Sequence, residues 1–298
     1  MKIKIFLSII FTSYAFAQNA FLGLSTWTDG STVGYSGGGY LMSFQNSFRN
    51  AAMLVGADRS ISLNIIKYPA DINAQSAIIN GKLKNQNFGL AIRNINYGIF
   101  ESRSSDNIFT GSFSANDTQI DISYARYIYK KKIIIGINSG LFLSQLENTN
   151  ASLIKISPTV MLKAKDFSTS LIIKNYNKVL DSYTDNDLTL RPSVILSLHK
   201  SLDRFPLEIE FSTVSSRSPI KRVTNVSFLY RNSNNVFIRG GTSTNRSDRI
   251  SGNQFIRNIL NDIGLGFGYE METLSIALNT FSYSNSHLLY GFSISSKF

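Results

Sequence analysis

From about residue 60 to the C-terminus, apolar side chains alternate with small or polar ones, in short runs separated by turn-forming residues. In one such run Ile263, Leu265, Phe267 and Tyr269 alternate with three glycines and Glu270. A period of two places each set of side chains on its own face of a β-strand. The pattern therefore predicts β-sheet with one apolar face and one polar face.

About fourteen such runs can be delimited. The expected strands are 60–68, 72–84, 87–97, 116–129, 132–145, 151–164, 167–176, 190–200, 205–215, 222–231, 235–243, 262–270, 273–283 and 287–298. Pro158 predicts a bulge or kink inside one of them, because proline donates no hydrogen bond to a sheet. The polar stretches 98–115, 177–189 and 244–261 are expected to be long extracellular loops.

Two architectures share this alternation. A soluble sandwich buries the apolar face against a second sheet, whereas a transmembrane barrel turns it towards lipid. After residue 17 no apolar run approaches the roughly 18–20 residues of a membrane helix, so any crossing would use strands. The 14 Tyr and 21 Phe, many near strand ends, suit the aromatic girdles of barrels. We predict an all-β fold, a transmembrane antiparallel β-barrel of about 14 strands.

The N-terminus has the layout of a secretory signal peptide. Lys2 and Lys4 precede an apolar stretch at 6–16, and Ala15-Phe16-Ala17 fits an A-x-A cleavage site. A membrane anchor is the alternative, but the stretch is too short and lacks a polar stop. Cleavage near Ala17 and a barrel together predict a bacterial outer-membrane location.

Residues 18–59 do not follow the alternation. They contain Gly37, Gly38 and Gly39 and then a stretch at 44–54 that could form a short helix. We expect a plug in the barrel lumen, with a periplasmic tail as the alternative. The expected organisation is a signal peptide at 1–17, a plug segment at 18–59 and a barrel at 60–298.

The last run places aromatic and aliphatic residues on one face and ends on an aromatic residue. A terminal aromatic residue on an amphipathic strand is what the outer-membrane assembly machinery recognises, and few soluble chains end this way. The residues expected to form this assembly signal are Tyr290, Phe292, Ile294 and Phe298.

The chain is basic, with 30 Lys and Arg against 19 Asp and Glu and a formal net charge of +11. These cations are spread singly along the chain, often at strand ends, and form no dense patch in the sequence. Nucleic acid is therefore not expected as a partner. Attraction to anionic lipopolysaccharide or to an acidic partner fits the pattern better.

Candidate catalytic and metal-binding residues are weak. His199 and Ser201 have the H-x-S spacing of outer-membrane lipid A deacylases, but any strand gives such a pair by chance. Asp181, Asp185 and Asp187 lack the glycine and glutamate of a calcium loop. Glu208 and Glu210 share a strand face, where lumenal Lys or Arg would relieve their repulsion. With no cysteine and two histidines, no zinc site, cofactor or enzymatic activity is expected.

Three stretches resemble the PorQ family of type IX secretion, part of the wider FadL-like group of barrels with an N-terminal plug. They are Ala70-Asp-Ile-Asn73, Ile95-Asn-Tyr-Gly98-Ile-Phe100 and Thr110-Gly-Ser-Phe-Ser-Ala115-Asn-Asp117. The likeness continues through 204–207, 264–268 and 281–287 and covers nearly all of the mature chain. One departure is Ser47, which stands where the family usually has a proline.

The resemblance implies a member of the cell-surface attachment complex that holds a partner protein at the surface, without catalytic residues of its own. The alternative is a FadL-like transporter of small hydrophobic molecules, although the lumen-facing residues are mostly small, polar or charged. Exposed aromatic and arginine residues commonly anchor protein interfaces. The candidates in the expected loops are Phe100, Arg103, Phe109, Phe113, Arg246, Arg249, Phe255 and Arg257. Packing of these residues on one another is an equal alternative.

Overall fold

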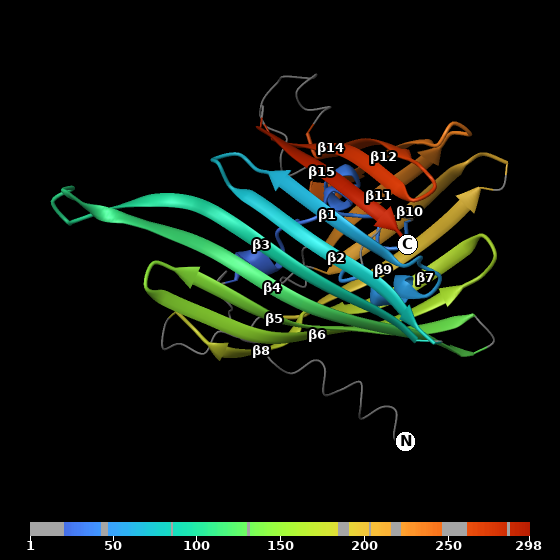
Figure 1. The fold of residues 1–298 in the computed structure, drawn as a ribbon, viewed down its shortest axis with the longest axis horizontal. Coiled ribbons are helices and arrows are strands. Elements are labelled where there is room, and N and C mark those ends of the chain that lie inside the picture. Colours follow the sequence, from blue (N-terminus) through green and yellow to red (C-terminus); the bar gives the residue numbers. More distant parts are fainter. Residues whose placement is uncertain are drawn as a thin grey trace.

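A computed structural model describes residues 21–42, 47–84, 86–129, 132–183, 191–202, 204–215, 222–245, 261–284 and 287–298. All strands belong to one antiparallel sheet, in which neighbours along the chain pair in almost every case. The first strand pairs with the last, and β5 pairs with β6, so the sheet closes into a barrel (Figure 1).

The fifteen strands and the short helices have the following bounds. They are η2 (Leu22–Leu24), α2 (Gly30–Gly34), η3 (Ala51–Leu54), β1 (Ser60–Lys67), β2 (Asn73–Leu83), β3 (Gln86–Arg103), β4 (Phe109–Tyr129), β5 (Ile133–Leu146), β6 (Thr149–Lys163), β7 (Phe167–Lys174), β8 (Tyr176–Asp181), β9 (Ser193–Leu202), β10 (Leu207–Ser215), β11 (Arg222–Arg231), β12 (Val236–Ser243), β13 (Ile263–Glu270), β14 (Leu274–Ser284) and β15 (His287–Lys297).

Strands β7 and β8 are two halves of one interrupted strand. Both pair with β6, β7 along 159–163 and β8 along 152–156. Between them lies Asn175, which has a φ of 58°. Counted as one strand they give fourteen, which confirms the predicted barrel.

The irregularity expected from Pro158 is found in the strand that pairs with β6, namely β7 and β8, rather than in β6 itself. The register of β6 on β5 runs through Pro158 without a shift. On the other side of β6, Pro158 falls between the last residue that pairs with β7 and the first that pairs with β8. The predicted irregularity is therefore an interrupted ladder, not a kink in β6.

The outer surface of the barrel is apolar. On β1, Ile61, Leu63 and Ile65 are 39–53% exposed, whereas Asn64 and Ile66 between and beyond them are at most 5% exposed. The same parity holds on other strands, and it leaves dozens of large apolar side chains on the outside. A soluble protein would bury such a belt, and lipid accommodates it.

Among the described residues, none of the helices has both the length and the apolar character needed to cross a membrane.

The two ends of the barrel differ in their connections. At one end the turns 84–85, 130–132, 164–166, 203–206, 232–235 and 271–273 are two to four residues long. At the other end the connections 182–192 and 244–262 are much longer, and β3 and β4 continue as a projecting hairpin (Figure 1). Transmembrane barrels have short periplasmic turns and longer extracellular loops. We name the two ends accordingly.

The N-terminal segment, here residues 21–42 and 47–59, lies inside the barrel. Helix α2 begins after Asp29, whose carboxylate accepts from the Thr32 amide across 3.0 Å. The helix packs on the inner wall, because the Gly30 amide donates to Asn64 Oδ1 on β1. Gly30 also lies so close to Ser293 that a Cβ would be 2.3 Å from its Oγ.

The predicted helix at 44–54 is wrong in the described part. Residues 43–46 lie outside the described residues, 47–50 are non-helical, and only η3 is helical, as a single 3-10 turn. Asn50 caps it by accepting from the Ala52 amide across 3.1 Å. Its Ala51 and Ala52 lie against Gly136 of β5, so the inner wall rather than helix propensity fixes this turn.

Candidate functional site

The β3–β4 hairpin stands beyond the apolar belt. On β4 the outward side chains include exposed Ile122 and Ile120, and then change to Thr118 and Asn116. On β3 the belt ends in the same way after Ile92. Eleven further residues, 93–103, lead to the end of β3, which is about 36 Å of strand at 3.3 Å per residue. Figure 1 shows this hairpin as the longest projection of the barrel.

The outer part of the hairpin, beyond Asn96 and Ala115, pairs with neither neighbouring strand. The last pair of β2 with β3 is Asn73 with Asn96, and the last pair of β4 with β5 is Ala115 with Leu146. Further out, β3 and β4 pair only with each other in the described part of the chain. The predicted loop at 98–115 is therefore wrong, because strand pairing continues to Arg103 and resumes at Phe109.

A bulge at Gly98 reverses the faces of β3 relative to the barrel below. Gly98 has a φ of 93°, and its amide donates to Asn96 Oδ1 across 2.7 Å. The register skips one extra residue here, from Asn96–Asn116 to Ile99–Ser114. As a result Ile99 lies on the outward face and Phe100 on the inward face.

The four described partner-binding candidates divide between these two faces. Phe100 and Phe113 stack on the inward face, with ring centroids 5.4 Å apart and planes 23° apart. Arg103 pairs across the strands with Phe109 on the outward face, where its guanidinium also bonds Glu101 at 2.7 Å. Phe100 and Phe113 thus pack on each other, whereas Arg103 and Phe109 are exposed.

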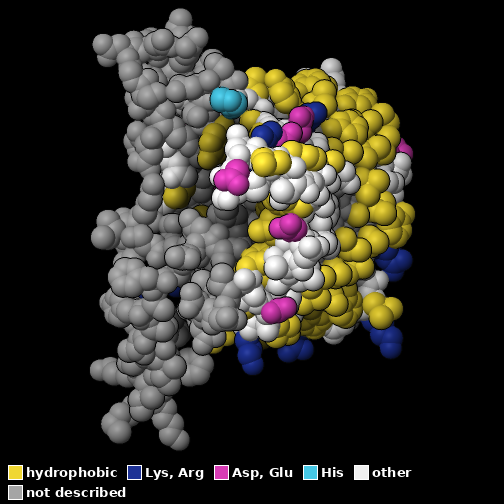
Figure 2. Space-filling view, turned by 90° about the vertical axis from the view of Figure 1, so that its left-hand side faces the viewer, with side chains coloured by type: hydrophobic (Ala, Val, Ile, Leu, Met, Phe, Trp, Pro, Cys, Tyr) yellow, Lys and Arg dark blue, Asp and Glu magenta, His cyan; other side chains and the backbone are white. Residues whose placement is uncertain are grey.

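The outward face combines apolar exposure with charge. Ile99 is 80% exposed, Ile108 64% and Phe109 58%. In Figure 2, which views the extracellular end, polar and acidic side chains occupy the middle of the described surface and the apolar belt its flank. The remaining candidates, Arg246, Arg249, Phe255 and Arg257, lie outside the described residues.

The other predicted loops are only partly described. Residues 177–181 of the expected loop 177–189 belong to β8, which corrects that expectation. Asp185 and Asp187 lie outside the described residues, so the acidic loop is not seen whole. No group of three or more candidate metal ligands occurs in the described ranges.

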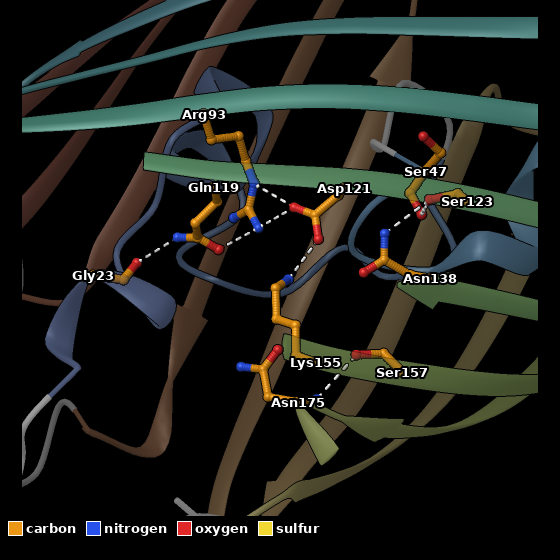
Figure 3. Close-up of polar contacts among 10 residues, drawn as sticks. All are labelled: Gly23, Ser47, Arg93, Gln119, Asp121, Ser123, Asn138, Lys155, Ser157 and Asn175. Atoms are coloured by element: carbon orange, nitrogen blue, oxygen red, sulfur yellow. Dashed lines mark hydrogen bonds and ion pairs between the residues drawn. The ribbon is translucent and has the colours of Figure 1, made fainter. Parts of the chain in front are cut away.

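The lumen is crossed by a buried ionic network that the sequence reading did not identify (Figure 3). Asp121 on β4 accepts from Arg93 Nε on β3 at 3.0 Å and from Lys155 Nζ on β6 at 2.6 Å. All three side chains are at most 5% exposed. Arg93 also donates to Gln119, whose amide donates to the Gly23 carbonyl at 2.9 Å. The network therefore ties three strands to the N-terminal segment.

A second carboxylate holds the same segment from another part of the barrel wall. Glu210 on β10 is fully buried and accepts from the amides of Tyr40 and Leu41 at 2.8 and 2.6 Å. Arg49 closes the segment on itself by donating to the carbonyls of Gly37 and Gly38. The segment thus has contacts to two separate parts of the barrel wall, and we refer to it as the plug.

Below the plug, a cavity of about 690 Å³ lies at the periplasmic end. Leu41, Met42 and Met53 of the plug are among its apolar lining residues, and strand serines line much of its wall. Near its rim Lys297 pairs with Glu270 at 2.9 Å. The apolar lining is thus largely confined to the plug side.

The side chains considered as catalytic candidates, His199 and Glu208, make structural contacts. His199 Nε2 lies 3.2 Å from Glu208 Oε2, and Arg231 pairs with the other oxygen of Glu208. The predicted relief of Glu208 by a basic side chain is therefore confirmed. Ser201 lines the same cavity, but the described contact of the imidazole is to the carboxylate.

The expected assembly residues share one face of β15, which pairs with β1 and β14. Tyr290 is 57% exposed, Phe292 41% and Phe298 74%. Ile294 is partly exposed on the same parity. The Phe298 amide donates to the Arg59 carbonyl at 3.1 Å, so the terminus adjoins the beginning of β1.

Comparison with solved structures identifies the fold of the chain. No family model matches the chain. No curated protein matches it either. Among solved structures, a Pseudomonas aeruginosa FadL homologue matches with a TM-score of 0.51 and 11% identity, over 91% of this chain and 98% of the homologue. The P. putida toluene transporter TodX matches at 0.45 and 11% identity, over 91% and 95% of the two chains. The chain has a FadL-like barrel fold, typical of the bacterial outer membrane.

Proposed function

We propose that this protein anchors a surface partner at the outer membrane, as a PorQ-like member of the attachment complex of type IX secretion. The observation that carries the proposal is the β3–β4 hairpin. It continues for about 36 Å of strand beyond the apolar belt and exposes Ile99 and Phe109 beside the Glu101–Arg103 pair. Aromatic and arginine side chains of this kind are common interface anchors.

The presence of the plug in the lumen is consistent with an anchoring role. Hydrogen bonds from two separate parts of the barrel wall, at Gln119 on β4 and Glu210 on β10, hold the plug inside the barrel. Anchoring needs a rigid platform and no continuous path. The proposal involves no catalytic step.

The test is co-purification from detergent-solubilised outer membranes, followed by mass spectrometry. In the test variant, Asn-Gly replaces residues 100–113 and links the cross-strand partners Ile99 and Ser114 through a two-residue turn. We expect a stable surface protein with the wild type and its loss with this variant. The control is F205A, which removes an exposed aromatic ring (66%, against 58% for Phe109) from a periplasmic turn. Equal recovery of the partner with the shortened hairpin would contradict the proposal.

Two paired substitutions then identify the contacting face. F100A/F113A alters the inward stack, and R103A/F109A alters the outward pair. If the outward face binds the partner, only the second variant lowers its recovery. Because all four positions lie beyond the belt, neither variant should affect barrel assembly.

Transport of small hydrophobic molecules is the second candidate function. The shared fold with a FadL homologue and the interruption between β7 and β8 favour it. Beside the interruption, Phe21 of the plug lies in an apolar cluster with Phe142, Leu153 and Val179. Entry of a small aromatic dye into proteoliposomes at a rate well above that of empty liposomes would support transport.

A further inference from the structure

The periplasmic turns bring together basic residues that are far apart in the sequence. Four turns are involved, those of β2–β3, β4–β5, β6–β7 and β9–β10, and the strands that they join are neighbours around the barrel. The described basic residues at or next to these turns are Lys82, Lys84, Arg126, Lys132, Lys163, Lys165, Lys200 and Arg204. We call this set the basic arc.

The arc has little acidic compensation. Within the same distance of these turns the described acidic residues are Asp166, Glu208 and Glu210. Glu208 already pairs with His199 and Arg231, and Glu210 is buried against the plug. On the other side of the ring the β13–β14 turn instead carries Glu270 and Glu272. The extracellular end mixes both signs, as in the Lys67–Asp71 and Arg103–Glu101 pairs. Cations that are spread singly along the sequence are thus brought to one arc of the barrel, because strand pairing places alternate turns side by side.

Two of these cations continue the lipid-facing rows of the apolar belt. On β4 the outward row runs from Ile122 through Tyr124 to Arg126. On β9 it runs from Leu198 to Lys200.

Exposed aromatic rings lie at the same level. Lys200 pairs across the strands with Phe167 on β7, which is 43% exposed. Tyr127 and Tyr129, 40% and 52% exposed, lie beside Arg126 at the end of β4. Aromatic residues of this kind mark the level of lipid headgroups in membrane proteins.

We propose that the basic arc binds anionic phospholipid headgroups of the periplasmic leaflet. The ligand class follows from charge and position, because cations that end a lipid-facing row adjoin lipid phosphates rather than bulk water. Arg126, Lys132 and Lys200 make no ion pair within the described ranges, so their charges are available for phosphate oxygens. The proposal differs from the expected attraction to lipopolysaccharide, since the arc lies at the end with short turns.

The test compares two variants of the full chain that lose equal charge from opposite ends. R126Q/K132Q/K200Q removes three cations of the arc. K67Q/K178Q/R222Q removes three exposed cations at the extracellular end and is the matched control. Folding of both is checked by the change in gel mobility on heating. Native mass spectrometry then measures retention of phosphatidylglycerol and phosphatidylcholine with identical acyl chains.

We expect the wild type and the control variant to retain phosphatidylglycerol at roughly tenfold lower lipid concentration than phosphatidylcholine. The arc variant should lose this preference and keep its binding of phosphatidylcholine. Salt at about 1 M, where the screening length is about 3 Å, should remove the preference from all proteins. No preference in the wild type, or an equal preference in both variants, would overturn the proposal and favour an acidic protein as the partner of the arc.

Discussion

Arg93 on β3 donates from Nε to Asp121 Oδ2 on β4 across 3.0 Å, with the two side chains 5% and 0% exposed. The second oxygen of the same carboxylate accepts from Lys155 on β6. One acidic group thus balances two buried cations on the lumen wall. An ion cluster of this kind is costly to disrupt, because removing one partner leaves buried charge without compensation.

Asp121→Asn should therefore lower the free energy of unfolding by about 3–5 kcal/mol. The measurement is denaturant unfolding of the full chain in lipid. Asp71→Asn is the matched control, because it breaks an ion pair to Lys67 whose side chains are 64% and 93% exposed. Such exposed pairs contribute at most about 1 kcal/mol. Similar losses for both variants would show that the lumenal cluster is not stabilising.

Glu210→Ala should loosen the plug while the barrel remains folded. The variant removes both acceptors from the buried amides of Tyr40 and Leu41, at a cost of about 1–3 kcal/mol for each unsatisfied group. Planar-bilayer recordings should show channel openings with the variant that are rare with the wild type. Glu272→Ala, on an exposed periplasmic turn, is the control and should behave as wild type. A silent Glu210→Ala barrel would mean that other contacts hold the plug.

Gly136→Ala tests the close approach of η3 to the wall. A Cβ at Gly136 would lie 2.6 Å from the Ala52 amide nitrogen, a backbone atom that cannot rotate away. We expect a loss of about 1–3 kcal/mol in the free energy of unfolding. Gly81→Ala is the control, because no atom lies within 4 Å of its added Cβ. Equal stability of the two variants would mean that the plug can shift at this point without cost.

Most strands could be predicted because the alternation that defines them is local. The range 222–231 was predicted to the residue, since lipid on one side and lumen on the other impose opposite polarities. The prediction failed beyond the apolar belt, where the strands no longer lie between lipid and lumen. Above the belt, β3 extends to Arg103 through residues such as Glu101 and Ser102, whose strand conformation depends on pairing with β4 rather than on alternation.

The lumenal network was not predicted from the sequence. Charged residues on the inward parity, such as Asp121 and Lys155, were visible in the sequence as polar interruptions of apolar strands. Their meeting depends on the register of the consecutive strands β4, β5 and β6, because Lys155 reaches Asp121 across β5, and no local pattern encodes this register. The basic arc likewise depends on strand pairing, which places turns that are far apart in the sequence side by side. The plug was expected from its composition, but its turns follow from the shape of the wall.

Phe298→Ala should lower the amount of assembled barrel in cells without lowering its stability. The Phe298 side chain is 74% exposed, so its removal takes little packing from the folded barrel, and its backbone bond to Arg59 remains. If the terminal ring serves as the assembly signal, its loss acts before folding is complete. The measurements are the outer-membrane level of the chain in cells and the unfolding free energy of refolded protein. Phe205→Ala, which removes a ring that is 66% exposed, is the control and should leave both unchanged. A normal cellular level of Phe298→Ala would show that the remaining aromatic residues of β15 suffice for assembly.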